Sequence, residues 1–410
     1  MSIAQEFNPV GASFDDIYKQ LAAARAEEPV FYSEQLQCWV VTRYDDVLAV
    51  LNDAENFTVE DILSGFNYSE EASNILSEGI NWNETQHVTV VDGSEHVRLR
   101  SIIQNVLSPR RFREMEPVLR GLANELIDRF AAQGECEFIE DYAYPLPILA
   151  VFRLIGFNES DEDMKKLQQW SDDTFKMWLT PMEPDEQAVC ARHAVDFQNY
   201  IRAKIHDRRA NPQGDVMSAM VQQMDSGEVQ ITEDELVLIF IFNLIGAGHE
   251  TTKAQLGNMM YQLLREPARW QAFVDDPSSA EAVAEESIRF DGSVITWYRR
   301  AAKNVNFKGH DIKANDFVLM AFGSANHDDS KFDNASSFCP VHGKKPVSLT
   351  FSQGKHFCLG APLARMELRV TLEELAKRLP GLRMKPGQEI VYDPAVATRS
   401  LSALQLEWDV

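Results

Sequence analysis

Residues 351–360 read Phe-Ser-Gln-Gly-Lys-His-Phe-Cys-Leu-Gly, and Ala-Pro-Leu-Ala-Arg follows at 361–365. The stretch places Cys358 on a loop that leads into a helix, because Pro362 suits a first helical turn and leucines recur beyond it at helical spacing. A helix N-terminus carries partial positive charge and unpaired amide groups, which favour the thiolate over the thiol. Cys358 is therefore a candidate metal ligand.

Three neighbours of this cysteine favour a flat cofactor. Gly354 and Gly360 have no side chains, so the backbone there can approach such a cofactor closely. His356 offers an imidazole hydrogen bond to an anionic edge of the cofactor. The alternative is a buried structural cysteine, which is the more common role of an isolated cysteine.

Composition limits the class of protein. The chain has 410 residues with no Gly/Ser-rich or Pro-rich linker, so we expect one domain over residues 1–410. A net charge of −24 argues against nucleic acid as a partner. Five cysteines without a spacing pattern favour a reducing compartment. No signal peptide is visible, and the apolar stretch 236–248 is shorter than the roughly 20 residues of a membrane span, so we expect a soluble, cytoplasmic monomer.

Periodicity predicts a mainly α protein with a small β part. Residues 39–42 read as a strand and 45–51 as a helix, and helical periodicity dominates from 92 to 289. Further β signals lie at 294–302, at 305–322 and in the last twenty residues. Residues 60–90 look irregular, and loops of that length are usually functional or disordered.

Two helical segments carry polar residues of interest. In the helix that begins with an acidic cap at Asp92, His96 and Arg100 are four residues apart and share a face, so they can meet one anionic group; a solvated helix face is the alternative. A helix of about 34 residues begins at the capping-box pattern of Thr232 and Glu235. Its middle, residues 244–252, reads Leu-Ile-Gly-Ala-Gly-His-Glu-Thr-Thr.

The glycines and polar residues in that middle weaken a buried helix locally, by about 1 kcal/mol for each glycine. Thr251 and Thr252 could simply bond back to carbonyls and kink the helix. The functional alternative is that small residues admit a cofactor while Glu250 and Thr251 handle protons. A later pair, Glu286 and Arg289, forms an ion pair at i and i+3, which is weak evidence by itself.

These segments together resemble the cytochrome P-450 family. Phe351, Gly354, His356, Cys358 and Gly360 match its haem-binding loop, Phe-x-x-Gly-x-(His/Arg)-x-Cys-x-Gly. Residues 247–251 match the family's oxygen-activation motif, (Ala/Gly)-Gly-x-(Asp/Glu)-Thr, and Glu-x-x-Arg follows in the family's order. The resemblance covers nearly the whole chain and implies the P-450 fold, with haem b between the long helix and the cysteine loop.

The resemblance also implies roles for individual residues. Cys358 is the axial haem ligand, and Ala247 and Gly248 let the helix pass over the haem face. Glu250 and Thr251 deliver protons. Glu286 and Arg289 are structural. The residues implied to hold the haem propionates are His96, Arg100, Arg299 (with Arg300 as the alternative) and His356.

The chain departs from the family pattern at three places. Gly93-Ser94 stands where the family usually has two prolines, and His327 and His342 stand where it often has arginines. The histidines weaken a charged network behind the haem. They place in doubt the electrostatics of that side and not the ligand.

The implied activity is haem-thiolate monooxygenation of an apolar or aromatic small molecule with O₂. Electrons would come from a ferredoxin or flavodoxin and its NAD(P)H-dependent reductase, since no flavin-binding or iron–sulfur segment is present. Basic islands at 98–113 and 344–369 are candidates for docking that partner, or ordinary solvated charge. The rival functions are a peroxide-driven peroxygenase and a haem-based sensor. By resemblance, the pocket-lining candidates are Phe66, Tyr68, Trp82, Trp178, Ile241, Leu244, Ile295, Thr296 and Val396.

Overall fold

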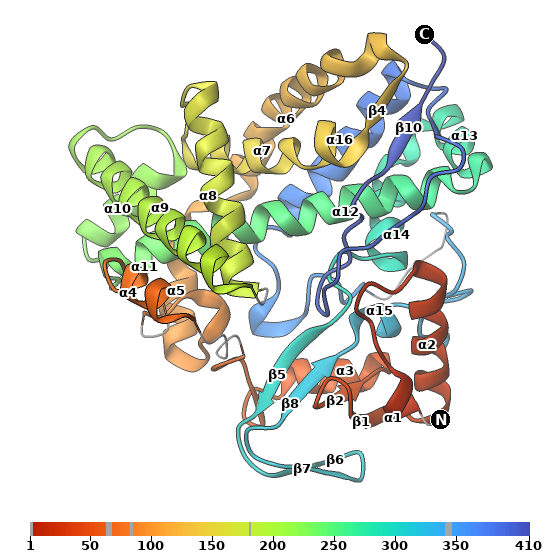
Figure 1. Ribbon diagram of the computed structural model, residues 1–410, viewed down its shortest axis with the longest axis horizontal. Helices are drawn as coiled ribbons and strands as arrows, with labels where there is room; N and C mark the ends of the chain where they lie inside the picture. The colour runs from red at the N-terminus through yellow and green to blue at the C-terminus, as the bar shows by residue number, and fades with distance from the viewer. Residues whose placement is uncertain (1–2, 63–67, 83–84, 180–181, 341–346) are drawn as a thin grey trace. The chain divides into compact units, whose positions relative to one another are not determined.

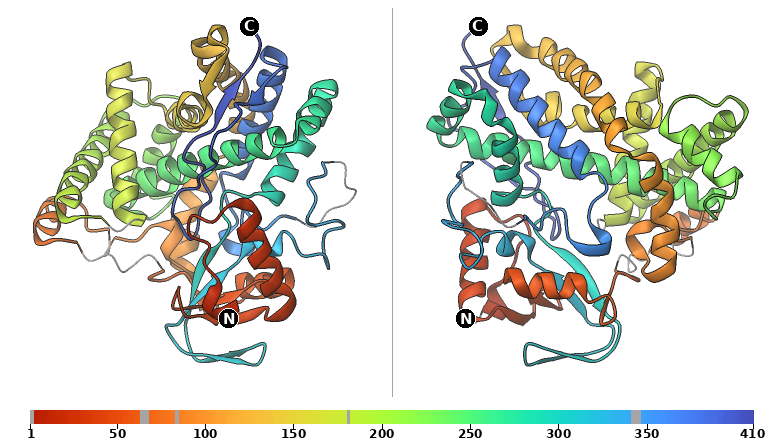
Figure 2. Two further views of the ribbon diagram at one scale, coloured as in Figure 1. Left: turned by 45° about the vertical axis from the view of Figure 1, so that its right-hand side comes forward. Right: turned by 180° about the vertical axis from the view of Figure 1, so that it is seen from behind.

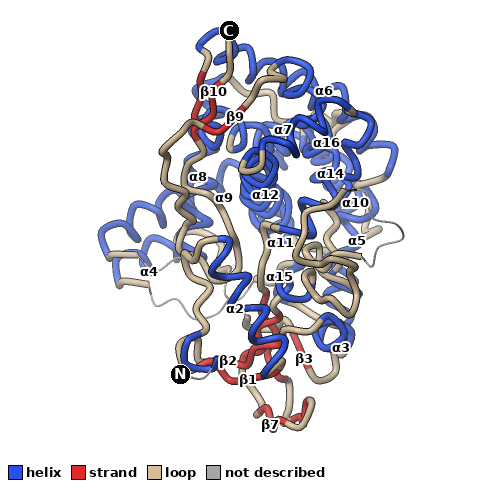
Figure 3. The backbone as a smooth tube through the Cα atoms, turned by 90° about the vertical axis from the view of Figure 1, so that its right-hand side faces the viewer, coloured by secondary structure: helices blue, strands red, loops and turns tan. Residues whose placement is uncertain are grey.

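The structure is a computed structural model that describes residues 3–62, 68–82, 85–179, 182–340 and 347–410. Contacts between residues group the chain into two compact units. Unit 1 comprises Met1–Thr58, Glu116–Pro147 and Glu250–Val410, and unit 2 comprises Val59–Met115 and Ile148–His249. Helices predominate, as Figures 1 and 3 show, so the expected mainly α fold with a small β part is confirmed. The single domain expected from the sequence remains a prediction.

A five-stranded sheet is the main β element of unit 1. Its strand order is β1-β2-β8-β5-β3, in which β2 and β8 run parallel and the other neighbours antiparallel. Figure 3 shows its strands gathered beside α2 and α3. Two small sheets, β4-β10-β9 and β6-β7, complete the β part. The strands are β1 (Val30–Ser33), β2 (Cys38–Val41), β3 (Phe57–Thr58), β4 (Glu135–Glu137), β5 (Trp297–Ala301), β6 (Val305–Phe307), β7 (His310–Ile312), β8 (Phe317–Met320), β9 (Arg383–Met384) and β10 (Gln405–Glu407).

These strands confirm most of the β signals. The strand predicted at 39–42 is β2, and the signals at 305–322 and near the C-terminus are β6, β7, β8 and β10. The strand expected from residue 294 begins only at Trp297, because residues 294–296 bond to the C-terminal segment instead. Val41, Val318 and Met320 turn into a core that also contains Val47 and Val50 of α3.

Helices surround the sheets of unit 1. In α2 the Ser13 side chain accepts from the Asp16 amide, which caps the helix start. Figure 2 shows α16 beside α6, and Arg120 of α6 forms ion pairs with Glu373 and Glu374 of α16. The helices are α1 (Ile3–Glu6), α2 (Phe14–Glu27), α3 (Tyr44–Asn52), α13 (Pro267–Asp275), α14 (Ala280–Phe290), α15 (Phe322–Ala325) and α16 (Ala361–Arg378), with the short turns η2 (Ala131–Gln133), η3 (Ile139–Ala143), η5 (Pro277–Ser279) and η6 (Gly354–His356).

Unit 2 is helical in its described part. Figure 2 shows α8 and α9 side by side, and both belong to this unit. The elements are α4 (Glu70–Leu76), η1 (Val88–Val90), α5 (Gly93–Val106), α8 (Asp161–Leu179), α9 (Pro184–Ala210), α10 (Val216–Asp225), α11 (Glu233–Leu238) and η4 (Ile239–Gly246). Three helices contribute residues to both units: α6 (Pro109–Phe130), α7 (Pro145–Ile155) and α12 (Ala247–Leu264).

Two local expectations in unit 2 need correction. Residues 60–90 contain helix α4, whose start is capped by the Ser69 side chain accepting from the Ala72 amide. The sequence carried that signal in a serine before two acids, but the weak apolar periodicity hid it. Asp92 stands at the start of α5 without capping it, because its carboxylate accepts from the Val59 amide at 2.8 Å.

The long predicted helix is a run of three consecutive segments, α11, η4 and α12. The capping box of Thr232 and Glu235 is present in both directions, and Pro267 starts the next helix. The middle segment, η4, has π-helical bonding, a form that is rare and recurs at functional sites. Within the described residues, no helix combines the length and apolar character that crossing a membrane requires.

Candidate functional site

The cysteine loop belongs to unit 1 and is held by its own backbone. The Cys358 amide donates to the Phe351 carbonyl at 3.0 Å, and the turn η6 lies between them. Gly354 has a φ of +72°, and a Cβ there would lie 3.1 Å from Asn52 Oδ1. A glycine is therefore required at position 354 by the positive φ and by the close approach of Asn52 at the end of α3. Cys358 is partly exposed and forms no disulfide.

Gly360 supports a group bound against the cysteine. It opens α16 with ordinary helical angles, φ −79° and ψ −7°, which any residue adopts. A Cβ there would meet, among the described atoms within 4 Å, only Cys358 Sγ, at an ordinary 3.7 Å. Neither backbone strain nor a protein neighbour explains this glycine. A flat cofactor held by the sulfur would explain it, so the loop fits a thiolate-ligated haem.

Strand β5 of unit 1 separates the two candidate arginines. Arg299 is buried, whereas Arg300 is half-buried next to the edge strand β3. Successive strand residues point to opposite faces, so only one of them can serve a given site. A buried guanidinium requires anionic or polar partners, and Arg299 Nη1 donates to the Tyr298 carbonyl at 3.0 Å. The contact of Arg299 with a haem propionate remains a prediction.

Helix α12 exposes a stripe of small residues. Ala247 is exposed and Gly248 and Thr251 are half-buried, although His249, Thr252 and most of the helix are buried. These three positions share one helix face. The stripe is where the sequence predicted haem contact and proton delivery, and Thr251 lies on it while Thr252 does not.

The glycines near this stripe are packing positions within unit 2. A Cβ on Gly246 would overlap the Phe175 ring of α8, and a Cβ on Gly248 would lie 2.8 Å from Val151 of α7. Close helix contact thus requires both glycines. The predicted passage of Gly248 over the haem face remains a prediction, and the structure supplies a second reason for that glycine.

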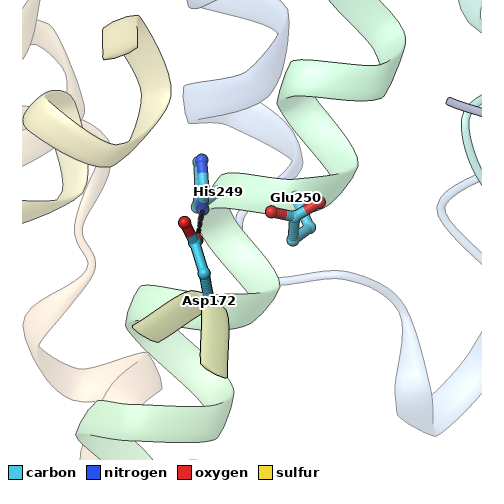
Figure 4. Close-up of side chains that lie close together, drawn as sticks. All are labelled: Asp172, His249 and Glu250. Atoms are coloured by element: carbon cyan, nitrogen blue, oxygen red, sulfur yellow. Dashed lines mark ion pairs between the residues drawn. The ribbon is translucent and has the colours of Figure 1, made fainter. Parts of the chain in front are cut away.

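Two charged contacts beside the stripe escaped the sequence reasoning. Figure 4 shows His249 directed at Asp172 of α8, with 3.9 Å between His249 Nδ1 and Asp172 Oδ1. Glu250 pairs instead with Lys253, at 2.9 Å and one helical turn further on. The i, i+3 spacing of Glu250 and Lys253 was the available signal. No pattern in the sequence links Asp172 to His249.

The predicted propionate pair lies on α5 in unit 2. His96 is buried and Arg100 half-buried, and the helix is regular, so they share a face as expected. Arg98 lies elsewhere on α5 and pairs with Glu95 and Glu235. The predicted site residues are thus divided: Ala247, Gly248, His96 and Arg100 belong to unit 2, and Glu250, Thr251, Arg299, Phe351, His356, Cys358 and Gly360 belong to unit 1.

Glu286 and Arg289 form the buried structural pair that the sequence predicted. Their two contacts measure 3.0 and 2.8 Å. Arg289 also donates to the carbonyls of Asn326, Ala335 and Ser337, and Glu286 accepts from the Cys339 amide. The pair therefore fixes two chain segments of unit 1 against α14, one at Asn326 and one at residues 335–339.

His327 shows what its departure from the arginine pattern means. Its Nε2 donates to the Phe290 carbonyl at 2.7 Å, and its ring stacks on Tyr18. Burial lowers the pKa of His327 to about 3, so the imidazole is neutral. A neutral ring replaces a cation, which confirms the weaker charge expected there. His342 lies outside the described residues.

The pocket candidates fall into two groups. In unit 2, Trp82 contacts both Tyr68 and Phe242 of η4, and Phe242 also contacts Phe175 and stacks on His87. Burial lowers the pKa of His87 to about 4. Ile241 and Leu244 are buried in η4.

In unit 1, the Thr296 hydroxyl donates to the Val396 carbonyl next to Ile295. Phe66 and the side chain of Trp178 lie outside the described residues.

Comparison with known proteins gives one consistent family. The family model described as Cytochrome P450 matches residues 30–272 and 279–384. Cytochrome P450 CYP107DY1 of Priestia megaterium is 31% identical over 89% of this chain and 88% of its own length. Mycinamicin IV hydroxylase/epoxidase of Micromonospora griseorubida is 30% identical over 98% and 99%.

Solved structures agree with this result. The cytochrome P450 CREJ in complex with (4-ethylphenyl) dihydrogen phosphate has a TM-score of 0.90 at 27% identity, over 99% of this chain and 100% of that chain. The P450 heme domain of Tepidiphilus thermophilus has a TM-score of 0.92 at 27% identity, over 99% and 97%. The protein is therefore a haem-thiolate enzyme. It belongs to the cytochrome P450 family, whose relatives of this chain are bacterial monooxygenases, hydroxylases and oxygenases.

Proposed function

We propose that this P450 inserts one atom of O₂ into an apolar or aromatic small organic substrate, using electrons from a separate redox protein. Cys358 is the axial ligand of haem b, and His96, Arg100, Arg299 and His356 hold its propionates. The bound haem supplies the oxygen activation that side chains lack. The observation that carries the proposal is Gly360, because a Cβ there would lie 3.7 Å from Cys358 Sγ and a flat group bound to the sulfur would account for the missing side chain.

The helix α12 contributes proton handling. Thr251 is half-buried and lies on the same stripe as Ala247, which is exposed. Glu250 is the adjacent acid, and its ion pair with Lys253 orients the carboxylate. An acid next to a hydroxyl on this face of the helix would be suited to holding and passing protons at the haem site. A peroxide-driven enzyme has no need of that pair.

The ligand is tested by the spectrum of the reduced carbonyl complex. A strongly red-shifted Soret band in the parent and its loss in Cys358→His are expected, because only a thiolate ligand gives that shift. Cys339→Ser is the matched control, since Cys339 is also partly exposed and forms no disulfide. A parent without the band, or a band that persists in Cys358→His, refutes the proposal.

Thr251→Val and Thr252→Val test proton handling as a matched pair. Both replace a hydroxyl by a methyl group in adjacent residues of one helix, but only Thr251 lies on the stripe. We expect Thr251→Val to lower the product formed per NAD(P)H by about 100-fold, the lower end of the range for loss of a proton-transfer group, and to release peroxide. Thr252→Val should stay near the parent. Equal effects of the two variants contradict the assignment.

The rival functions separate in the same assays. A peroxygenase would convert substrate with peroxide but not with reductant and O₂. A haem sensor would show the thiolate spectrum without turnover in either assay. Monooxygenation requires turnover with reductant and O₂ and the Thr251 dependence above.

We propose that electrons come from a ferredoxin or flavodoxin that contacts the cysteine loop. The structure reduces the number of candidate contact residues in the basic islands, because Arg365 and Arg369 already pair with acids of their own unit. Lys344 and Lys345 lie outside the described residues. Lys355, exposed and three residues before Cys358, has no ion pair among the described residues. It is the candidate contact for an acidic partner.

Charge reversal tests this contact. Lys355→Glu should lower the rate of the first reduction at low salt by several-fold and flatten its salt dependence, since it removes attraction at encounter. Lys19→Glu on α2, also exposed, is the control. The contact is wrong if the two variants show the same salt dependence as the parent.

The substrate class rests on the aromatic cluster of Tyr68, Trp82, His87, Phe175 and Phe242 in unit 2. Relatives named mycinamicin IV hydroxylase/epoxidase and nocardicin C N-oxygenase act on small organic molecules by their names. A screen of such compounds for a substrate-induced spin-state change tests the class. A cytoplasmic monomer is proposed as well, consistent with five cysteines that form no disulfide, and gel filtration tests the oligomeric state.

A further inference from the structure

Three amide side chains form a buried row on α12, outside the oxygen-activation motif. Gln255, Asn258 and Gln262 are spaced by three and four residues, so they share one face of the helix. All three are buried, and all three donate to Asp291, which follows α14. Such amides in a helix interior cost free energy when their hydrogen bonds are not made, and Asn258 Oδ1 and Gln262 Oε1 have no partner among the described residues. The bonds that the three amide nitrogens donate to Asp291 are therefore the common feature of the row.

The row fixes two segments of unit 1 as well as Asp291. Gln255 accepts from the Ser293 amide at 2.8 Å, and Asn258 donates to the Arg399 carbonyl at 3.0 Å. Arg399 closes the network, because its Nε donates to Asp291 at 3.2 Å and its amide donates to the Ser293 carbonyl at 2.8 Å. Backbone at 291–293 and at 399 is thus held against the same face of α12.

The two held segments lead directly to the pocket candidates of unit 1. The amides of Ile295 and Thr296 both donate to the Ala397 carbonyl, at 3.0 and 3.3 Å, and the Thr296 hydroxyl donates to the Val396 carbonyl. Residues 293–296 and 396–399 therefore form one hydrogen-bonded ribbon. Its anchor is the amide row, and β5 with Arg299 continues from its end.

The ribbon has an apolar character. The Thr296 hydroxyl is engaged by the Val396 carbonyl, which leaves the Thr296 methyl group and the Val396 alkyl group as the apolar part of the ribbon, whereas the Ile295 side chain packs against Gly323. A displacement of the ribbon along α12 would move these apolar groups together. Hydrogen bonds made by Asn258 and Gln255 to its backbone oppose that displacement, and a buried polar group left without a partner costs about 1–3 kcal/mol.

We propose that Gln255, Asn258 and Gln262 are positioning residues that set the ribbon of residues 293–296 and 396–399 relative to α12, and thereby the affinity for the apolar part of a substrate. The inference rests on the proposed function, because it takes the ribbon as part of the substrate site. None of the three amides is proposed to touch haem or substrate.

The test uses the haem-loaded protein and two nitrogen ligands, imidazole and 4-phenylimidazole. The affinity for imidazole measures binding to the haem iron alone. The ratio of the two dissociation constants measures the additional binding of the phenyl group to the apolar site. Gln255→Met and Asn258→Leu remove the hydrogen bonds while keeping side-chain bulk. Gln271→Met on α13 is the matched control, since Gln271 is exposed and bonds only to Asp275 among the described residues.

We expect both variants to keep the thiolate carbonyl spectrum and to lower the preference for 4-phenylimidazole by about fivefold or more, a change equivalent to about 1 kcal/mol. Amide hydrogen exchange at Ile295 and Thr296 should accelerate in both and stay unchanged in Gln271→Met. Gln255→Glu, which keeps the acceptor for Ser293, should recover part of the preference.

Two results overturn the inference. One is an affinity ratio within twofold of the parent in both variants, which would show that the ribbon does not depend on the row. The other is loss of the thiolate spectrum in both, which would show that the row supports the fold and not the substrate site. A parent that itself lacks the spectrum refutes the proposed function, and this inference falls with it.

Discussion

Replacing Arg289 by methionine should be among the most damaging single changes in this protein. Glu286 and Arg289 are 0% and 3% exposed, and they contact each other through both carboxylate oxygens. Removing the cation leaves a buried carboxylate that still accepts from the Cys339 amide but has lost its counter-ion, which costs about 3–5 kcal/mol. Three carbonyls also lose a donor, at about 1 kcal/mol each.

Urea unfolding of the haem-loaded protein measures this cost, followed by tryptophan fluorescence and by the Soret band. The matched control is Arg110→Met, which breaks an exposed pair with Glu114 whose side chains are 83% and 58% exposed, and which should leave the stability close to that of the parent because solvent screens such a pair. The double variant Glu286→Gln/Arg289→Met should be less unstable than Arg289→Met alone, because the uncompensated charge is gone. A cost below about 1 kcal/mol for Arg289→Met, or a more unstable double variant, would refute the reasoning.

Three further predictions concern other buried positions. Burial lowers the pKa of His327 to about 3. Between pH 6.5 and 3 the unfolded chain therefore binds a proton that the folded chain excludes, so the stability falls as the pH falls, by about 2 kcal/mol at pH 5. His327→Gln should reduce this loss, measured by urea unfolding at pH 5 and pH 7. Burial raises the pKa of Glu367 well above 4.5, so stability falls as the pH rises through the folded-state pKa, and Glu367→Gln should flatten that fall in a melting series from pH 5 to 9. Gly246→Ala should destabilise the protein in thermal melts, because the new Cβ overlaps the Phe175 ring, and adding Phe175→Leu should restore part of the loss; no recovery would contradict the contact.

The starts of some helices could be predicted from short local sequence patterns. The start of α16 follows from Pro362 after a glycine, and the start of α11 follows from the capping box of Thr232 and Glu235. Such signals act over three or four residues, so they need no knowledge of the rest of the fold. The family resemblance added the order of the motifs, and the comparisons confirmed the family.

Other features had no local signal. Ser69 followed by Glu70 and Glu71 predicts the start of α4, but the weak apolar periodicity of the segment argued against a helix. The packing of α4 on α9, which only the tertiary structure shows, supports the helix. The burial that separates Arg299 from Arg300 depends on which face of β5 is covered. The alternation of side chains along a strand predicts that Arg299 and Arg300 point to opposite faces of the sheet, but it does not predict which of the two is buried.

The sequence by itself determined the cysteine at a helix start, the acid–threonine pair at Glu250 and Thr251, and the family to which they belong. These are patterns of neighbours along the chain. Tertiary structure alone decided why Gly246 is a glycine and why Asn258 is an asparagine, because Phe175 and Arg399, the residues that they contact, are remote in sequence. Steric exclusion and buried hydrogen bonds are properties of residues brought together by folding, and no local pattern records them.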